Sequence, residues 1–430
     1  MADTYWLSRR RFLRSAAIVV GGSLLAACQQ AGPAPAPAAA TNPPAQGAPA
    51  PTTAPAQQAP AQAGAAPSPK IGAVMGLTGR YAALTEQVRN GYELAFADLN
   101  KSSKLQLELK MLDDESDANK TVQRVESLYS GDNVLAFLGG AGSDLHAAAA
   151  AVADKNKTPY LGIAFALLTV HQKGLRYLFS PFPKSPALSK SVFELLDTVS
   201  PKPTKIAIFT EKTDWGAELN GLWKQDGPAK GYEVVANEEY APGSQDYSSL
   251  ILKGKSANAD VLLAMPTPPD GMAMLKQMKE LDFGPKVLQF IRASDSLVWS
   301  TNLGKDGDLA LNAPGWSPDL KYPGVAELRS AHQAKYNKSA EALTGSAYAA
   351  VQILFDAVNK VGKADREALR DAIAATDMMT LSGPVKFNAD GTAQIVTVFN
   401  QWVGAKQVLI WPKDQAAQAI QVAKPWRERS

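Results

Sequence analysis

A short glycine-rich run, GGAGS at residues 139–143, has the residue types in this 430-residue chain that best suit binding of a small anion. It lies between an apolar, strand-like stretch and a stretch of helical period. Glycines at such a junction leave backbone N–H groups exposed beside the positive end of the helix dipole, where they can hold a carboxylate. The dinucleotide pattern G-x-G-x-x-G is not matched, because its third glycine would fall on Leu145. We expect this turn to bind a carboxylate. The alternative is that the glycines serve only to shape the turn.

Other chemistry-bearing side chains are too scattered to form a catalytic set. The three histidines, His146, His171 and His332, stand apart without a second metal ligand at a typical spacing. The acidic run DDESD at residues 113–117 is more typical of a solvated turn than of a cation site, and LKGKS lacks the first glycine of a phosphate-binding loop. We therefore expect no enzyme activity, no cofactor and no metal, because no nucleophile, base and oxyanion donor occur together.

The only cysteine, Cys28, follows an arginine-rich start and an apolar stretch at residues 15–27. A lone cysteine excludes an internal disulfide and a cysteine-based zinc site. The apolar stretch is shorter than a membrane-spanning helix and is typical of an export signal. SRRRFLR at residues 8–14 resembles the twin-arginine motif, and LAAC at residues 25–28 resembles a bacterial lipobox. We expect residues 1–27 to be a signal peptide and Cys28 to carry a lipid anchor, with an unmodified cysteine as the alternative.

Residues 28–69 are rich in alanine and proline and carry no charge, so we expect a solvated tether. The formal net charge of +3 arises within residues 1–27, and the rest of the chain is neutral. A neutral chain without a basic cluster argues against a nucleic-acid partner.

From residue 70 onward, strand-like apolar runs alternate with stretches of helical period in two successive series. The strand-like runs lie at residues 70–76, 105–112, 134–140, 158–165, 205–211, 232–240, 260–266 and 286–292. Such repeats predict parallel sheets wound with helices on both faces. Three further helices are expected near residues 325–336, 345–361 and 366–376, and a hairpin is expected around Gly404. Ligands bind beyond the carboxyl ends of strands in such sheets, so two facing lobes would form a cleft.

Four strings in this order, at residues 76–100, 213–223, 242–255 and 382–391, resemble the Leu/Ile/Val-binding-protein family of type I periplasmic solute-binding proteins, which serve ABC importers. The resemblance covers residues 70–412. It implies an α/β fold of two doubly wound parallel-sheet lobes, joined by a three-stranded hinge, with the ligand cleft between the lobes.

The resemblance also implies how the chain is divided. Lobe 1 would comprise residues 70–183 and 315–388, and lobe 2 would comprise residues 184–314 and 389–412. The crossings between lobes would fall near Pro183, Pro314 and Asn388, and residues 413–430 would form a C-terminal tail.

The family's ligand loops correspond to residues 76–85, 139–145 and 162–167 of lobe 1. With lobe 2, the resemblance implies a set of ligand contacts: Tyr81, Ala141, Gly142, Ser143, Ala164, Phe165, Ala166, Trp215, Thr267, Arg292 and Asp295. Trp215 matches the place of an aromatic residue across the ligand. Tyr81 and Phe165 would complete the walls.

Two positions depart from the family's amino-acid-binding pattern. Ala166 stands where a hydroxyl is expected for the ligand's carboxylate, and the acid expected for its ammonium falls near Ala293, between Arg292 and Asp295. A buried ammonium without a partner is costly, so an amino-acid ligand would require Asp295 in that role. An apolar or aromatic carboxylate fits at least as well. Arg292 is open to two roles, as ligand anchor or as salt-bridge partner.

The signal motifs at residues 8–14 and 25–28 imply an exported, membrane-anchored lipoprotein on the extracytoplasmic side, and the family resemblance implies what it does there. It would capture a small apolar amino acid, or a related aromatic or aliphatic carboxylate, by lobe closure and deliver it to an ABC permease. The alternatives are a sensing module for a membrane kinase or chemoreceptor with the same fold, and an exported hydrolase.

Overall fold

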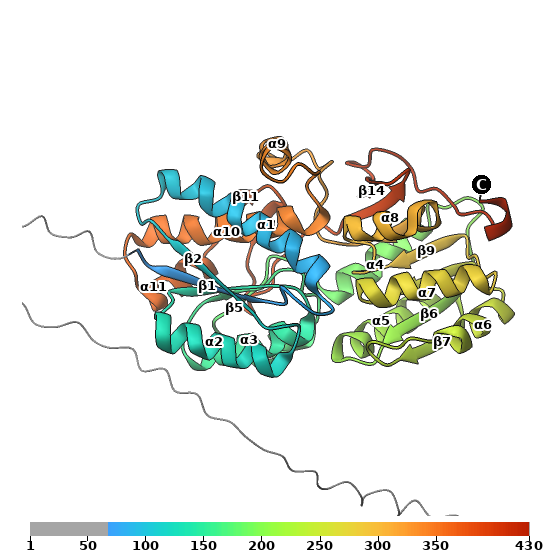
Figure 1. Cartoon of the computed structure of the whole chain (residues 1–430), viewed down its shortest axis with the longest axis horizontal. Coiled ribbons are helices and arrows are strands. Elements are labelled where there is room, and N and C mark those ends of the chain that lie inside the picture. The colour runs from blue at the N-terminus through green and yellow to red at the C-terminus, as the bar shows by residue number, and fades with distance from the viewer. Residues whose placement is uncertain (1–67, 430) are drawn as a thin grey trace, which may run out of the picture. The chain divides into compact units, whose positions relative to one another are not determined.

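The computed structural model describes residues 68–429, which form two α/β lobes (Figure 1). The predicted signal peptide, Cys28 and the tether up to residue 67 lie outside the described residues. Within residues 68–429, no helix combines the length and the apolar character needed to cross a bilayer.

Lobe 1 is built on a five-stranded parallel sheet in the order β2-β1-β3-β4-β5. Its strands are β1 Lys70–Met75, β2 Glu108–Asp113, β3 Ala136–Gly139, β4 Tyr160–Leu161 and β5 Leu178–Phe179. One face carries α1 Ala82–Leu99, α10 Ala342–Val361 and α11 Arg366–Ala374, and the other carries α2 Ala118–Asp132 and α3 Ser143–Lys155. Apart from Lys70 at the start of β1, the central strands β1 and β3 carry no charged residue and are buried, because helices cover both faces of the sheet.

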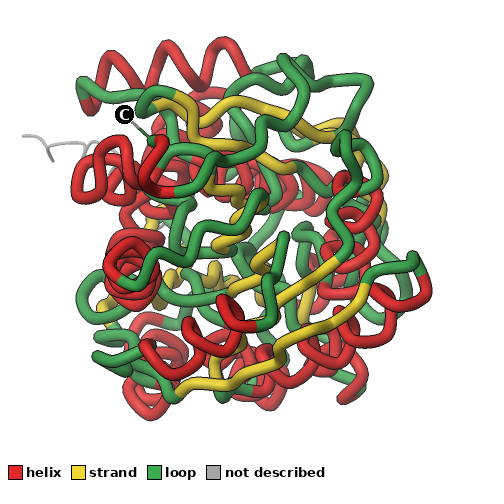
Figure 2. The backbone as a smooth tube through the Cα atoms, turned by 90° about the vertical axis from the view of Figure 1, so that its right-hand side faces the viewer, coloured by secondary structure: helices red, strands yellow, loops and turns green. Residues whose placement is uncertain are grey.

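Lobe 2 is built on a seven-stranded sheet in the order β14-β13-β10-β9-β8-β6-β7. Its strands are β6 Lys205–Glu211, β7 Glu233–Tyr240, β8 Val261–Ala264, β9 Val287–Phe290, β10 Ala310–Asn312, β13 Phe399–Val403 and β14 Lys406–Trp411. Its helices are α4 Ser185–Leu196, α5 Asp214–Ala229, α6 Ser248–Ser256, α7 Pro268–Glu280 and α8 Leu297–Leu303. Figure 2, which faces this lobe, shows strands in the middle and helices on both sides.

The predicted hairpin is confirmed as β13 and β14, which add two antiparallel strands to an otherwise parallel sheet. Gly404 and Ala405 both have positive φ, as a tight two-residue hairpin turn requires. Helix α9 Val325–Tyr336 and the hairpin of β11 Asp377–Thr380 and β12 Gly383–Lys386 lie beside lobe 1. Short 3₁₀ turns occur at η1 Asn100–Ser102, η2 Leu168–Lys173, η3 Gly304–Gly307 and η4 Trp426–Glu428. Strands β5 and β10 were not predicted, because two or three residues give no periodicity.

The third passage between lobes differs from the expected boundary at Asn388. Thr392 pairs with Ser180 beside the lobe 1 sheet, and Ala393 and Ile395 pack into the lobe 1 core. The chain enters the lobe 2 sheet only at Phe399, where β13 begins. The expected assignment of residues 389–395 to lobe 2 is therefore wrong, because strand pairing and apolar packing hold them to lobe 1.

The residues expected to form a C-terminal tail pack against lobe 2. The Trp426 indole donates a hydrogen bond to the Phe283 carbonyl at 2.7 Å, and the Ala423 N–H donates to the Lys286 carbonyl at 2.8 Å. Trp426 is buried in the lobe 2 core. This segment therefore stabilises lobe 2 as far as residue 429.

Candidate ligand site

A small pocket, with a cavity volume of about 30 Å³, lies between the two lobes. Its lining residues are Leu84, Ala141, Gly142, Ser143, Ala164, Ala166, Phe182, Leu188, Trp215, Ile291, Arg292, Asp295, Ala313 and Leu343. Most are apolar, and the charged groups among them are Arg292 and Asp295. The structure brings together eight of the predicted contact residues: Ala141, Gly142, Ser143, Ala164, Ala166, Trp215, Arg292 and Asp295.

Phe165 does not line this pocket, so its expected role as a wall is wrong. Its ring is buried in the core between His146 and His171, with ring centroids 4.9 Å and 5.5 Å away. Ala164 has a φ of +52°, so the chain bends there, and Ala164 and Ala166 line the pocket while the Phe165 ring lies in the core.

Tyr81 and Thr267 also lie outside the pocket lining. Tyr81 lines an adjoining outer cavity of about 230 Å³, which shares Ser143, Trp215 and Arg292 with the pocket. Thr267 precedes α7, where its hydroxyl donates to the Asp270 carboxylate at 2.9 Å. Tyr81 therefore lies near the mouth of the site, and Thr267 has a structural contact.

The glycine-rich run forms the junction between β3 and α3. Gly142 has a φ of +105°, and a Cβ there would lie 2.5 Å from the Tyr81 ring, so both backbone and space require glycine. Gly142 is the N-cap and offers no side-chain acceptor to the first turn of α3. The first N–H groups of a helix have no partner within the helix. The pocket thus has a helix N-terminus and Ser143 on one wall, as anion binding requires.

Arg292 extends along the lobe 2 wall and forms a buried ion pair. Its Nη2 lies 2.9 Å from Oε2 of Glu211, and the guanidinium lies 4.9 Å from the Trp215 ring centre. It also donates to the Met265 carbonyl. Burial opposes the charge, but the neighbouring Glu211 carboxylate holds the pKa of Arg292 above its usual range. The salt-bridge role left open for Arg292 is thus present in the structure, with a buried partner.

Asp295 is the other charged residue of the pocket wall, and its contacts differ from those of Arg292. Its side chain is buried, and Oδ1 has no hydrogen-bond partner among the described residues. Burial raises the pKa of the Asp295 carboxyl from 3.8 to about 7, and the Arg292 charge opposes part of that rise. A buried carboxylate oxygen without a partner is costly, so a donor group on a ligand would satisfy it.

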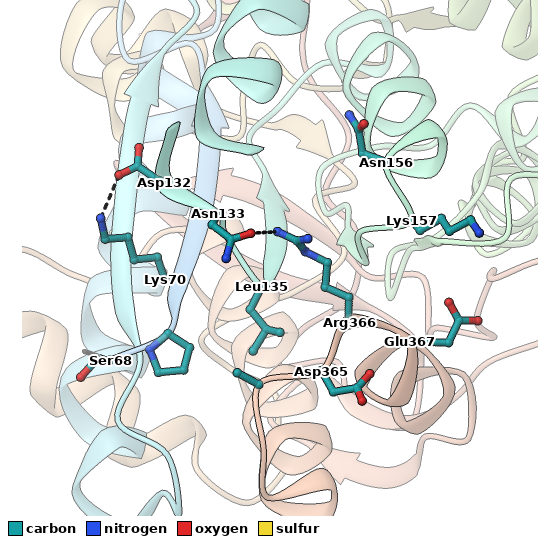
Figure 3. Close-up of a pocket in the computed structure, with 12 residues that line it drawn as sticks. Ser68, Lys70, Asp132, Asn133, Leu135, Asn156, Lys157, Asp365, Arg366 and Glu367 are labelled. Carbon is teal, nitrogen blue, oxygen red and sulfur yellow. Dashed lines mark hydrogen bonds and ion pairs between the residues drawn. The ribbon is translucent and has the colours of Figure 1, made fainter. Parts of the chain in front are cut away.

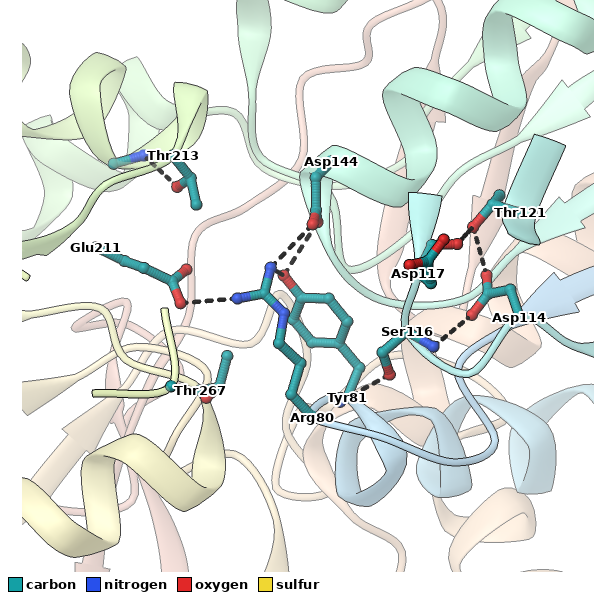
Figure 4. Close-up of polar contacts among 12 residues, drawn as sticks. Arg80, Tyr81, Asp114, Ser116, Asp117, Thr121, Asp144, Glu211, Thr213 and Thr267 are labelled. Carbon is teal, nitrogen blue, oxygen red and sulfur yellow. Dashed lines mark hydrogen bonds and ion pairs between the residues drawn. The ribbon is translucent and has the colours of Figure 1, made fainter. Parts of the chain in front are cut away.

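A network of charged groups at the mouth of the site was missed in the sequence. Figure 4 shows the Arg80 guanidinium between Asp144 of the same lobe and Glu211 of the other lobe, each at 2.9 Å. The Tyr81 hydroxyl donates to Asp144 at 3.0 Å. Glu211 ends β6, the first strand of lobe 2, so the rule that sites lie beyond carboxyl ends of strands could have indicated it.

The apolar residues of the pocket walls were also not predicted, because in the sequence they resemble residues of an apolar core. They are Leu84, Phe182, Leu188, Ile291, Ala313 and Leu343. Phe182 and Ala313 lie at the first two crossings between lobes, and Leu84 lies in the ligand loop expected at residues 76–85, so their positions in the chain were the signals available.

The acidic run at residues 113–117 supports the loop that carries Arg80 and Tyr81. The Ser116 hydroxyl donates to the Thr78 carbonyl at 2.7 Å and accepts from the Tyr81 N–H at 3.1 Å. Asp117 caps α2, and Asp114 accepts from the Thr121 hydroxyl at 2.8 Å (Figure 4). Residues 68–429 contain no cluster of three or more metal-ligating side chains.

A separate cavity opens at the amino end of β1, where the described chain begins (Figure 3). Polar side chains on its walls bind one another: Lys70 lies 2.9 Å from Asp132, and Arg366 donates to the Asn133 side-chain oxygen at 2.9 Å. The interlobe pocket lies at the opposite, carboxyl end of these strands. We assign no ligand to the cavity of Figure 3.

Two wound lobes around a pocket lined from both sides define a two-lobed binding protein. The family model described as periplasmic binding protein matches residues 68–406, so the chain belongs to the periplasmic binding protein family. The description of this family is that of a binding protein.

Curated relatives carry the Leu/Ile/Val-binding name. Leu/Ile/Val-binding protein homolog 8 of Brucella abortus is 26% identical over 379 residues, which cover 83% of this chain and 93% of that protein. Homolog 7 of the same species is 25% identical over 375 residues, covering 82% and 94%. The predicted resemblance is confirmed.

Solved structures share the fold. The leucine-binding protein LivK of Thermotoga maritima has a TM-score of 0.74 at 21% identity, covering 79% of this chain and 97% of that chain. A solute-binding protein of R. palustris, solved with benzoate, has a TM-score of 0.72 at 19% identity, covering 84% and 97%. The predicted fold class, a type I periplasmic binding protein, is confirmed.

Proposed function

We propose that the protein is the solute-binding component of an ABC importer and captures a small apolar amino acid or a related aromatic or aliphatic carboxylate between its lobes. The observation that carries this proposal is the interlobe pocket, which joins a helix N-terminus, apolar walls and the unpartnered carboxyl of Asp295. Three structural relatives agree with this ligand class. LivK of Thermotoga maritima is named as a leucine-binding protein, LivJ of Streptococcus pneumoniae was solved with isoleucine, and the R. palustris protein was solved with benzoate.

In this proposal the ligand's carboxylate lies at the start of α3, beside Ser143, where orphan N–H groups and the helix dipole favour a negative charge. Its apolar part packs against Leu84, Leu343 and Trp215, which come from both lobes. The ligand gains all of these contacts only when the lobes are closed. It therefore shifts the lobes toward the closed state.

The charge of Asp295 determines whether the pocket favours a ligand with an α-amine. Because the pKa of the Asp295 carboxyl is near 7, this preference depends on pH. An ammonium requires the carboxylate form, so binding of leucine should weaken as pH falls from 8 to 6. A carboxylate without an amine, such as benzoate, is repelled by that form and should bind better at pH 6. In a thermal-shift screen, we expect at least one carboxylate that lacks an α-amine to raise the melting temperature of the protein.

The screen compares amino acids with aromatic and aliphatic carboxylates at pH 6 and pH 8, each against the ligand-free protein at the same pH. Stabilisation by leucine, isoleucine and valine alone would contradict the broader ligand class. The same pH trend for leucine and benzoate would contradict the role given to Asp295. A turnover assay with esters and amides that yields product would contradict solute binding as the function.

We further propose that the chain is exported by the twin-arginine route and anchored on the extracytoplasmic side by lipid on Cys28. The support is the sequence: the twin arginines, the short apolar stretch and LAAC. Mass spectrometry of the membrane fraction should find Cys28 as the first mature residue, with a diacylglyceryl thioether. A free thiol at Cys28 would show that the anchor is absent, and Cys28→Ser serves as the matched control.

A further inference from the structure

Glu211 holds two guanidinium groups, one from each lobe. Its side chain is 0% exposed; Oε2 lies 2.9 Å from Arg292 of lobe 2, and Oε1 lies 2.9 Å from Arg80 of lobe 1. Glu211 is not among the residues that line the pocket, whereas Arg292 is. The Glu211 carboxylate therefore does not contact the ligand directly. It acts on the ligand through Arg292, whose charge it neutralises.

Neutralisation of Arg292 has a direct consequence for ligand charge. A buried guanidinium without a counterion is strongly unfavourable and would attract any carboxylate that could reach it. Arg292 lies on the wall formed by lobe 2, while the helix N-terminus that suits a carboxylate lies on the wall formed by lobe 1. A ligand with two carboxylates could satisfy both walls if Glu211 were absent. With Glu211 present, the second carboxylate would meet an arginine that is already paired, with Asp295 on the same wall.

We propose that Glu211 is a specificity-determining positioning residue, which makes the pocket select ligands with one carboxylate and reject dicarboxylates by neutralising Arg292. This inference rests on the proposed function, because it concerns the ligand of the same pocket. Arg80 is not required for it, since Arg80 contacts the other oxygen of Glu211 and does not line the pocket.

The test uses two probes of equal chain length, pentanoate and pentanedioate, in thermal-shift titrations of four proteins. These are the wild type, Glu211→Gln, Arg80→Met and the double variant Glu211→Gln/Arg292→Gln. In Glu211→Gln, pentanedioate should raise the melting temperature by about 3 °C or more, as expected for a ligand present well above its dissociation constant. In the other three proteins pentanedioate should give no stabilisation beyond that of pentanoate.

The double variant removes both charges together, so it is expected to fold even if Glu211→Gln is weakened by the unpaired arginine. If Glu211→Gln is unfolded in buffer, pentanedioate should restore its far-ultraviolet circular dichroism spectrum. The proposal is overturned if pentanedioate neither stabilises nor refolds Glu211→Gln. Equal stabilisation of the wild type, of Arg80→Met or of the double variant would overturn it as well.

Failure of the proposed function would give a different result. Wild-type protein that binds no amino acid and no carboxylate in the screen would contradict the proposed ligand class. The comparison of Glu211→Gln with the double variant would still report whether Glu211 controls the charge of Arg292.

Discussion

Replacing Asp295 by asparagine should weaken binding of leucine by about 100-fold, because loss of one partner of a buried charge pair costs roughly 3 kcal/mol. The substitution keeps the shape of a side chain that is buried in the pocket wall. Binding of benzoate should be retained or improved, because it brings no ammonium to this wall. Isothermal titration calorimetry with both ligands at pH 8 measures the difference, and an unchanged affinity for leucine would show that Asp295 does not contact the ligand.

The same substitution should stabilise the ligand-free protein at high pH. Burial raises the pKa of Asp295 from 3.8 to about 7, so its contribution to stability is fully present below pH 3.8 and is lost as pH rises through 7. The shift corresponds to at most about 4 kcal/mol at pH 8. Asparagine carries no charge, so Asp295→Asn should unfold at higher denaturant concentration than the wild type at pH 8 and lose that advantage near pH 4.

A surface aspartate of the same lobe provides the control for both effects. Asp306 is exposed and pairs with Lys279 at 2.7 Å. Asp306→Asn should neither weaken binding of leucine nor stabilise the ligand-free protein at pH 8, because exposed ion pairs contribute little. Equal behaviour of the two variants would mean that the effects do not depend on the pocket.

Trp215→Ala should lower both ligand affinity and stability. Trp215 lines the pocket but is only 5% exposed, belongs to the apolar core and donates from its indole to the Ser185 hydroxyl at 3.1 Å. Truncation of a buried tryptophan costs about 3 kcal/mol or more in unfolding free energy. We expect that loss in chemical denaturation, together with a fall in leucine affinity of about 100-fold or more from the opened pocket wall.

Trp223→Ala separates these two effects. Trp223 lies on the same helix and in the same apolar core, is fully buried and does not line the pocket. Its truncation should lower stability by a similar amount while the folded protein keeps its affinity. If both tryptophan variants lose affinity by the same factor, the loss reflects general destabilisation and Trp215 is not a ligand contact.

Local patterns in the sequence predicted loops that the structure brings to the interlobe pocket. The turn at residues 139–143 lies in the pocket because glycines after an apolar strand mark a strand-to-helix junction, and such junctions collect at the carboxyl edge of a parallel sheet. Trp215 and Asp295 reach the same pocket by the same rule in lobe 2. The rule places loops but does not orient single side chains, which is why Phe165 was assigned to the pocket and is found in the core.

The sequence by itself determined the two wound lobes, the terminal hairpin and the pocket-facing turn, because strand alternation, helical period and glycine placement are local properties of the chain. Tertiary structure alone decided the charges of the site. Glu211 and Arg292 are 81 positions apart, and Arg80 is 131 positions from Glu211. Whether such groups neutralise one another, and whether Asp295 keeps an oxygen free, depends on burial and distance. The packing of lobe 2 fixes the distance between Glu211 and Arg292, and the contact of Arg80 with Glu211 forms only when the two lobes pack together.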